Sequence, residues 1–187
     1  MTVPTARDRR ALRWALFLGL AGGIIVVDQV SKRWVDANFS LAWLTVPIPG
    51  YAPPTPIIGD LVRIAKSYND GGLFGLFGTG ALLLAVASMV VIGLILWFER
   101  RAAAGGPLLL TITLGLLLGG AVGNLLDRLR LGYVIDFVDM GIGDHRFFTF
   151  NVADSAISLA IAGLLLLSLF GDRLATAPPA RPETVDG

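Results

Sequence analysis

The sequence predicts an all-α integral membrane protein of four transmembrane helices, with a small β-containing loop region on the extracytoplasmic side. Two observations support this prediction. Apolar residues make up 55% of the 187 residues and charged residues 16%, with a mean hydropathy of +0.72. A soluble domain has about 45–50% apolar and about 25% charged residues. The apolar residues also fall into four long stretches, so residues 1–187 are expected to form a single membrane domain.

The four predicted spans cover approximately residues 14–34, 76–98, 107–126 and 152–170. A helix needs about 20 residues to cross a bilayer, and the last three spans meet this length. The first apolar run ends at Val27, so it is long enough only if the helix continues to about Trp34. Basic and aromatic side chains at that end suit the membrane interface.

The first stretch has an alternative interpretation as a cleaved signal peptide, because several arginines precede it. No small-residue cleavage site follows Val27, since the chain continues as Asp28-Gln29-Val30-Ser31-Lys32. A retained helix is therefore the favoured interpretation.

Basic residues predict the orientation. Four arginines lie in the N-terminal tail, and Arg100 and Arg101 follow the second span. Because cytoplasmic loops are enriched in Lys and Arg, both termini are expected in the cytoplasm, including a disordered tail at 171–187. The loops at 35–75 and 129–149 then face outward.

These outer loops carry two further expectations. Residues 61–65 (Leu-Val-Arg-Ile-Ala) resemble a strand and predict a small extracytoplasmic sheet. The short apolar stretch from Tyr133 to Met140 is expected to lie along the membrane interface.

Composition excludes several kinds of chemistry. The formal net charge is +1, which argues against nucleic acid as a partner, because that would need a basic face. The chain has no cysteine, so it has no disulfide, thiolate nucleophile or cysteine metal site. The single histidine, His145, disfavours a histidine metal site or a Ser–His relay. Carboxylates must carry most of the acid–base chemistry.

Polar residues gather at the outer ends of the spans. They are Asp28, Lys32, Asn124, Asp127, Arg128, Asp136, Asn151 and Asp154. Ionisable groups at membrane depth are costly and usually functional. Structural alternatives remain open: an N-cap at Asn151 with Asp154 in the first turn, an Asp127–Arg128 ion pair, and an Asp28–Lys32 pair four residues apart.

Asp136 and Asp154 are the favoured catalytic carboxylates. Two aspartates held close together cannot both ionise cheaply, so they share a proton, one acting as base and the other as acid. Such a pair can hydrolyse a peptide bond without a metal, because the base activates water and the acid protonates the leaving amine. Asn124, Arg128 and Asn151 could orient the pair or hold the substrate backbone.

Five blocks of sequence resemble the signature motifs of the lipoprotein signal peptidase (signal peptidase II) family. They are Asp28-Gln29-Val30-Ser31-Lys32, Asn69-Asp70-Gly71-Gly72-Leu73-Phe74, Gly119 to Arg128 (GGAVGNLLDR), Val134-Ile135-Asp136-Phe137, and Phe150-Asn151-Val152-Ala153-Asp154-Ser155. The resemblance covers roughly residues 12–170, with the blocks in order.

The family consists of bacterial inner-membrane aspartic proteases that cut prolipoproteins just before a diacylglyceryl-modified cysteine. The resemblance implies prolipoproteins and membrane lipids as partners, an active site toward the outer leaflet, and no metal or organic cofactor. By resemblance, Asp136 and Asp154 match the catalytic pair. The residues that match the site lining or its support are Asn69, Asn124, Arg128, Asn151, Asp28 and Lys32.

One block departs from the family pattern. It usually reads Asn-x-Gly-Ala-Ala-Phe, whereas this chain has Gly72 and Leu73 in place of the two alanines. Leu73 adds bulk and is expected to narrow the groove beside the cleavage point.

Two other classes of function compete with the protease. A proton-coupled transporter should carry ionisable groups at successive depths, but the middles of the last three spans contain none. A non-catalytic assembly factor would have no particular need for Asp136 or Asp154.

Overall fold

The structure is a computed structural model that describes residues 5–44, 47–71 and 80–174. Leu73 and residues 175–187, the greater part of the predicted disordered tail, lie outside the described residues. The elements in chain order are α1 (Ala6–Asn38), β1 (Thr55–Ile58), β2 (Val62–Asn69), α2 (Gly80–Ala102), α3 (Leu108–Leu131), β3 (Val134–Ile142), β4 (His145–Arg146) and α4 (Val152–Leu174).

All four helices are long and apolar enough to cross a membrane, which confirms the predicted helix count. Helix α1 begins before the predicted span, at Ala6, because Thr5 caps it. The Thr5 side chain accepts a hydrogen bond from the Asp8 backbone N–H, and the Asp8 carboxylate accepts one from the Thr5 N–H. Such a reciprocal capping box satisfies two helix-end donors. Helix α4 continues to Leu174, past the predicted end of its span.

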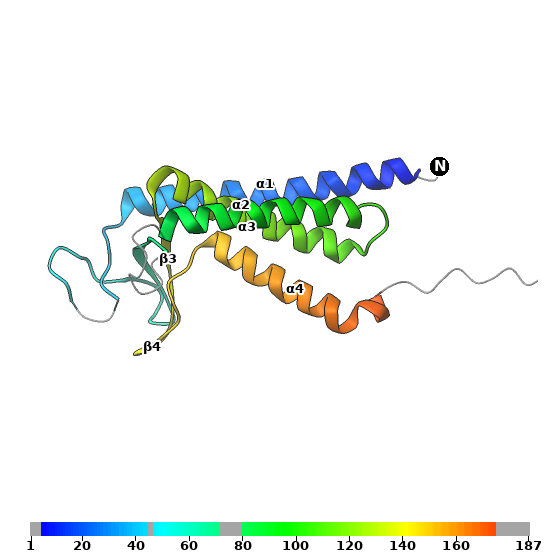
Figure 1. The fold of residues 1–187 in the computed structure, drawn as a ribbon. Helices are drawn as coiled ribbons and strands as arrows, with labels where there is room; N and C mark the ends of the chain where they lie inside the picture. The colour runs from blue at the N-terminus through cyan, green and yellow to red at the C-terminus, as the bar shows by residue number, and fades with distance from the viewer. Residues whose placement is uncertain (1–4, 45–46, 72–79, 175–187) are drawn as a thin grey trace, which may run out of the picture.

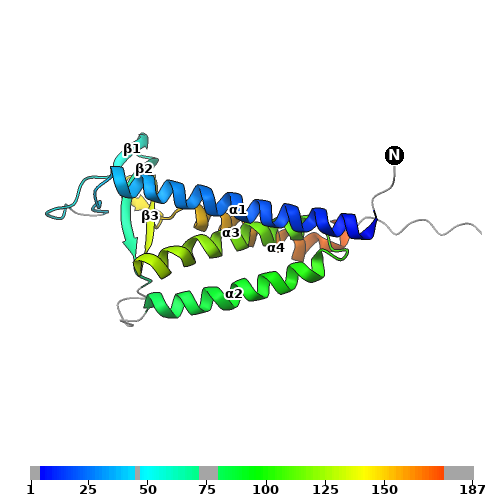
Figure 2. The same ribbon diagram turned by 90° about the horizontal axis from the view of Figure 1, so that it is seen from above.

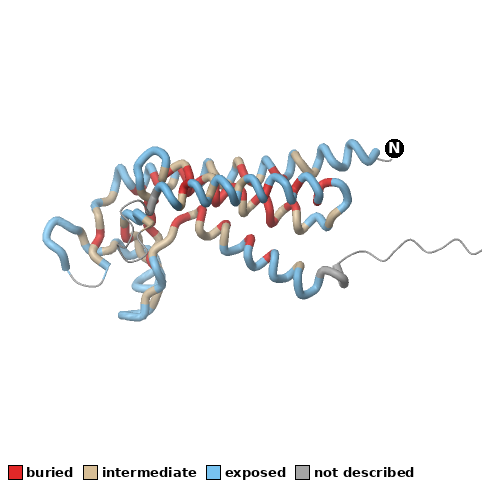
Figure 3. Tube along the Cα trace, viewed as in Figure 1, coloured by how far each residue is buried: buried red, intermediate tan, exposed pale blue. Residues whose placement is uncertain are grey.

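Helix α3 is central to the bundle, packing against α1, α2 and α4. In its apolar window 61% of residues are buried, against 17% in the other three helices. Figures 1 and 2 show the helices running lengthwise, with the sheet at the end opposite the N-terminus. The outer helix faces are largely exposed (Figure 3), and they carry large apolar side chains such as Leu82, Leu159 and Leu169. Lipid is the natural cover for such faces.

Glycines on α3 allow the neighbouring helices to approach closely. A Cβ atom at Gly119 would lie 2.7 Å from the Cβ of Ile24 on α1. One at Gly120 would lie 2.5 Å from the carbonyl oxygen of Ala153 on α4. At Gly123 the obstacle is polar, because the added Cβ would lie 2.7 Å from Asp28 Oδ2. Small residues at this spacing bring the backbones together, and Gly123 makes room for a buried carboxylate.

The four strands form one antiparallel sheet in the order β1-β2-β3-β4. The predicted strand at 61–65 is confirmed within β2. Most of the stretch from Tyr133 to Met140 forms strand β3, paired with β2, and its position along the membrane interface stays a prediction. The strand can begin here because Gly132 ends α3 with a φ of 81°, a left-handed conformation that glycine adopts readily.

Toward the N-terminal end of the bundle the core is apolar. Phe17 is fully buried and packs with residues of α2 and α3, among them Ile95 and Leu114. This apolar cluster contrasts with the opposite end, where the bundle meets the sheet and buries many polar and charged side chains.

Candidate active site

A group of buried polar side chains lies where α1, α3 and α4 meet strand β3. We call it the polar cluster, and it consists of Asp28, Gln29, Lys32, Asn124, Asp127, Asp136, Asn151 and Asp154. All are buried except Asp154, which is half-buried. The structure therefore brings together all but two of the site residues predicted from the sequence, and the other two, Asn69 and Arg128, lie at its edge.

Asn151 joins the two candidate catalytic carboxylates. Its side-chain Nδ2 donates a hydrogen bond of 2.7 Å to Asp136 Oδ1. Its backbone N–H donates to Asp154 Oδ2 at 3.2 Å. Its side-chain Oδ1 accepts from the Asp154 backbone N–H at 3.0 Å. One residue thus holds Asp136 on the sheet and Asp154 on a helix in a fixed relation.

The N-cap alternative for Asn151 is confirmed and is compatible with a site. The Asn151 side chain caps α4, and Asp154 lies in the first helical turn. Asp154 also accepts a 2.7 Å hydrogen bond from Asn124 Nδ2, which comes from α3. The same bonds that begin the helix therefore fix the orientation of the Asp154 carboxylate.

Asp136 is only 2% exposed on strand β3. Burial, and to a smaller extent the nearby charge of Asp154, together raise its pKa to about 6, while hydrogen bonds from Asn69 and Asn151 oppose the rise. The Asn69 bond, from Nδ2 to Asp136 Oδ2, measures 3.1 Å. A carboxyl with such a pKa keeps its proton more readily than an ordinary aspartate.

Lys32 is only 2% exposed, and it contacts three other members of the polar cluster. Its Nζ lies 2.9 Å from Asp28 Oδ2, 2.9 Å from Asp127 Oδ2 and 2.9 Å from Asn124 Oδ1. The Asp28–Lys32 pair is therefore confirmed. Among the described residues the ion pair formed by Asp127 is with Lys32, not with Arg128.

The sequence interpretation missed one member of this network, Gln29, and gave Asp127 only a local ion pair with Arg128. Gln29 Nε2 donates to Asp127 Oδ1 at 2.8 Å and to the Gly123 carbonyl at 3.2 Å. The Ile135 backbone N–H, next to Asp136, donates to Asp127 Oδ2 at 3.4 Å. A signal was available, because Gln29 directly follows Asp28 at the same end of the span.

Arg128 supplies positive charge beside the two carboxylates. Its Nη1 donates to the Asn124 carbonyl at 3.3 Å, and its charge acts on Asp154, Asp136 and Asp127. Its buried Nε has no hydrogen-bond partner among the described residues. The guanidinium is thus held near the carboxylates, and its Nε–H remains able to donate a hydrogen bond to a ligand.

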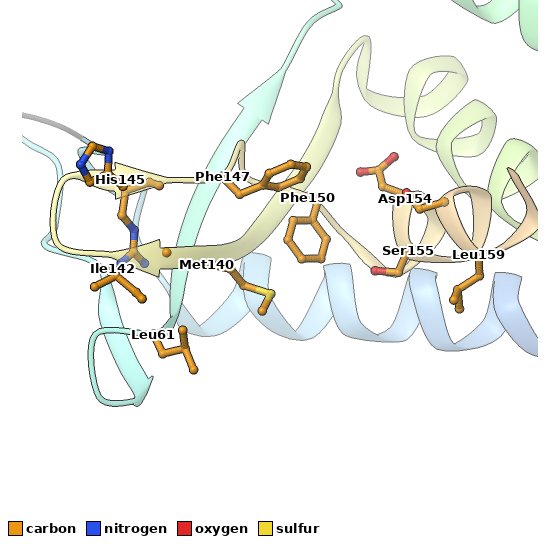
Figure 4. Close-up of a pocket in the computed structure, with 12 residues that line it drawn as sticks. Leu61, Met140, Ile142, His145, Phe147, Phe150, Asp154, Ser155 and Leu159 are labelled. Atoms are coloured by element: carbon orange, nitrogen blue, oxygen red, sulfur yellow. The ribbon is translucent and has the colours of Figure 1, made fainter. Parts of the chain in front are cut away.

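An open groove of about 1060 Å³ leads to Asp154. One wall is the β3–β4 hairpin, with Met140, Ile142 and Phe147, and the other is the start of α4, with Ser155 and Leu159. In Figure 4 the apolar side chains run from the hairpin tip to α4, with Asp154 at the α4 end. The groove can hold an apolar segment of a ligand against a carboxylate.

These features define the class of protein as a multi-pass membrane protein with a pair of linked carboxylates beside an apolar groove. Residues 20–170 match the family described as signal peptidase (SPase) II. The chain belongs to the signal peptidase II family, and it is a peptidase.

Named relatives agree with this assignment. The chain is 35% identical over 184 residues to the lipoprotein signal peptidase of Rhizorhabdus wittichii, covering 96% of this chain and 98% of the relative. It is 37% identical over 172 residues to the lipoprotein signal peptidase of Methylorubrum extorquens, covering 87% and 88% of the two chains.

Solved structures show the same fold. Two structures described as a bacterial membrane enzyme, determined by the in meso method at 2.3 Å and 1.9 Å resolution, superpose with TM-scores of 0.69 and 0.71. They cover 86% and 82% of this chain, and 91% and 92% of their own chains, at 22% identity. This likeness supports the arrangement of helices and sheet.

Proposed function

We propose that the protein is an aspartic endopeptidase that removes the signal peptide from diacylglyceryl-modified prolipoproteins, cutting before the lipidated cysteine. The family and the names of the relatives support peptide hydrolysis on this substrate class. The observation that carries the aspartic mechanism is the link through Asn151, which bonds to both Asp136 and Asp154.

In the proposed mechanism Asp136 carries the shared proton and Asp154 is the base. Asp136 is buried and has a pKa raised to about 6, whereas Asp154 lines the groove beside Arg128. Asp154 removes a proton from water as the water oxygen attacks the scissile carbonyl carbon, and Asp136 donates its proton to the carbonyl oxygen. When the tetrahedral intermediate collapses, the leaving amine takes the proton held by Asp154, and Asp136 recovers its own.

Polar residues in and beside the cluster support this pair by position and charge. Lys32 and Asn124 fix the α3 and α4 sides of the site, and Asn69 holds Asp136 from the neighbouring strand. Donors already in place at the start of the reaction need no reorganisation as charge develops. Arg128 is positioned to hold a substrate carbonyl.

We further propose that the sheet end faces outward from the bacterial inner membrane and that both termini are cytoplasmic. The basic turns of α1 and α2 lie at the end of the bundle away from the sheet (Figures 1 and 2), as the positive-inside rule requires. A reporter that works only outside the cytoplasm, fused after Gly187, should give no signal. A strong signal would contradict the proposed orientation.

Proton-coupled transport receives less support from the structure. A relay needs ionisable groups at successive depths. Among the described residues, the buried charged groups of the helices are the members of the polar cluster at one end and Glu99 near the other. Residues such as Leu114 and Leu118 fill the space between these ends.

The direct test uses the purified full chain in detergent or lipid, mixed with a diacylglyceryl-modified prolipoprotein and followed by gel shift. We expect one cleavage before the modified cysteine. The unmodified prolipoprotein is the substrate control, and Asp136→Asn is the enzyme control. Equal cleavage by wild type and Asp136→Asn would contradict the aspartic mechanism.

A further inference from the structure

Four charged side chains on the sheet are separate from the polar cluster. Asp60 lies in the turn between β1 and β2, Arg63 on β2, Asp139 on β3 and Arg146 on β4. We call these four residues the ion cluster. Three of them are largely buried, with Asp60 about half exposed.

Asp139 is the centre of the ion cluster. Its side chain is 3% exposed, and Oδ2 lies 2.6 Å from Arg63 Nη2 and accepts a 2.7 Å hydrogen bond from Arg63 Nε. Its Oδ1 lies 3.0 Å from Arg146 Nε. Arg63 is its direct cross-strand partner, and a forked two-point contact of this kind fixes geometry as well as charge.

Asp60 extends these contacts to the hairpin turn. Its backbone oxygen accepts a 2.6 Å hydrogen bond from Arg146 Nη1, and its Oδ1 lies 3.1 Å from Arg63 Nη1. Its Oδ2 accepts a 2.8 Å hydrogen bond from the Gly143 backbone N–H. The β1–β2 turn and the β3–β4 turn are thereby tied to each other.

The hairpin needs such a fixing point. Strand β4 has two residues and pairs only with Gly141 and Ile142, and two-stranded ribbons are marginally stable alone. The Ile142 side chain at the tip is 74% exposed. The same hairpin forms one wall of the groove, and Arg146 is part of that wall. Its position relative to α4 sets the width of the groove that leads to Asp154.

We infer that the ion cluster is a positioning element that sets the width of the substrate groove and so decides which side-chain sizes are accepted beside the scissile bond. This inference rests on the proposed peptidase function. The ion cluster acts through the hairpin wall, so weakening it should change selectivity between substrates more than it changes turnover.

The test compares two diacylglyceryl-modified prolipoproteins that differ only in the residue before the cleaved bond, alanine in one and leucine in the other. Arg146→Gln should change the ratio of their kcat/KM values by about tenfold, the scale on which apolar pockets discriminate by size. The change should fall mainly on KM, as expected for altered binding. Arg146→Lys keeps the charge but cannot make the several directed contacts of the guanidinium, so its ratio should lie between those of the wild type and Arg146→Gln.

Asp144→Asn is the matched control, because Asp144 is an exposed residue of the same hairpin turn outside the ion cluster. It should keep the wild-type ratio. If Arg146→Gln fails to fold, judged by thermal unfolding, Asp60→Asn at a half-exposed position provides a milder break and should shift the ratio in the same direction.

The outcomes separate the two proposals. If the wild type cleaves neither substrate, the proposed function is wrong. If it cleaves and Asp136→Asn does not, the function stands, and the ratio alone then tests the ion cluster. An unchanged ratio, or an equal loss on both substrates, would overturn the positioning role.

Discussion

At the sheet end of the bundle the buried carboxylates of Asp28 and Asp127 each lie 2.9 Å from Lys32 Nζ, whereas near the other end the buried Glu99 has far fewer partners. Glu99 is 0% exposed and accepts one long bond, 3.4 Å, from Thr111 Oγ1. Its Oε2 has no partner among the described residues. The sheet end is thus ordered by hydrogen bonds and ion pairs, and the opposite end by apolar packing around Phe17.

This difference between the two ends indicates that the buried polar groups of the sheet end are retained for function rather than for stability. Burying ionic groups is costly even when they are paired, and well-packed apolar residues are often as stable. The sheet end bears that cost over a whole network, which positions Asp136 and Asp154. Among the described residues, the other end buries a single carboxyl, that of Glu99.

The largest effect should come from breaking the catalytic pair. Asp136→Asn and Asp154→Asn each keep shape but cannot transfer a proton, so each should lower kcat about 10³-fold or more. The double variant should be little worse than either single one, because contributions within a catalytic unit are not additive. Single-turnover cleavage of the lipid-modified substrate measures this. Wild-type rates in either folded variant would contradict the proposal.

The next largest effect should come from removing the buried cation of Lys32. Lys32→Met would leave Asp28 and Asp127 buried without their cation, which should cost about 3–5 kcal/mol in the free energy of unfolding. Thermal unfolding in detergent measures the loss. The control is Arg33→Met, an exposed neighbour on the same helix, which should unfold like wild type. Equal stability of both variants would show that the network does not hold this end together.

The sequence predicted the helices and the one-sided polar gathering, because long apolar runs and the charges that end them are visible without tertiary information. Strand β3 was missed because its first four residues, Val134 to Phe137, are all buried. A strand buried on both faces reads as a plain apolar run rather than as an alternating pattern. The boundaries of α1 were missed because its first turns depend on the Thr5 cap.

The partner of Asp127 was also beyond the sequence. Asp127 and Arg128 are neighbours in the chain and suggest a local ion pair, but adjacent helix residues do not face each other. The choice of Lys32 depends on how closely α1 approaches α3, which Gly119 and Gly123 determine through backbone packing. Spacing in one helix cannot report such an approach between two.

A smaller effect should appear in the pH dependence. Asp136 has a pKa of about 6, so kcat/KM should fall as the pH rises above about 6 and the acid loses its proton. Asn69 donates a hydrogen bond that favours the ionised form. Asn69→Ala should therefore move this fall to higher pH. A movement to lower pH would contradict the assignment of Asp136 as the acid.

Stability should follow the same group. The pKa of Asp136 rises from 3.8 to about 6 in the folded protein, so the folded state binds its proton more tightly than the unfolded state. The resulting contribution of Asp136 to the free energy of unfolding is fully present below pH 3.8 and is lost as the pH rises to about 6. Asp136→Asn should flatten this part of the curve of thermal unfolding against pH.

The smallest expected effect compares the two ends by the same chemical change. Asp28→Asn removes a charge that lies 2.9 Å from Lys32 Nζ. In the wild type, Asp28 Oδ1 also accepts a 2.9 Å hydrogen bond from the Ala153 N–H. The substitution should cost about 1–3 kcal/mol. Glu99→Gln changes a carboxyl with one long bond and should alter the free energy of unfolding by less than about 1 kcal/mol.

The activities of the two variants should differ as well. Cleavage should fall in Asp28→Asn, because an amide NH₂ group in place of Oδ2 would face the Lys32 ammonium, and Lys32 also bonds to Asn124, which holds Asp154. Cleavage in Glu99→Gln should match wild type, because Glu99 lies near the opposite end of the bundle from the groove. Thermal unfolding and gel-shift cleavage, measured on both proteins in the same detergent, make the comparison. If Glu99→Gln proved as damaging as Asp28→Asn, the number of bonds around a buried carboxylate would not explain the difference between the two ends, and Glu99 would need a role of its own.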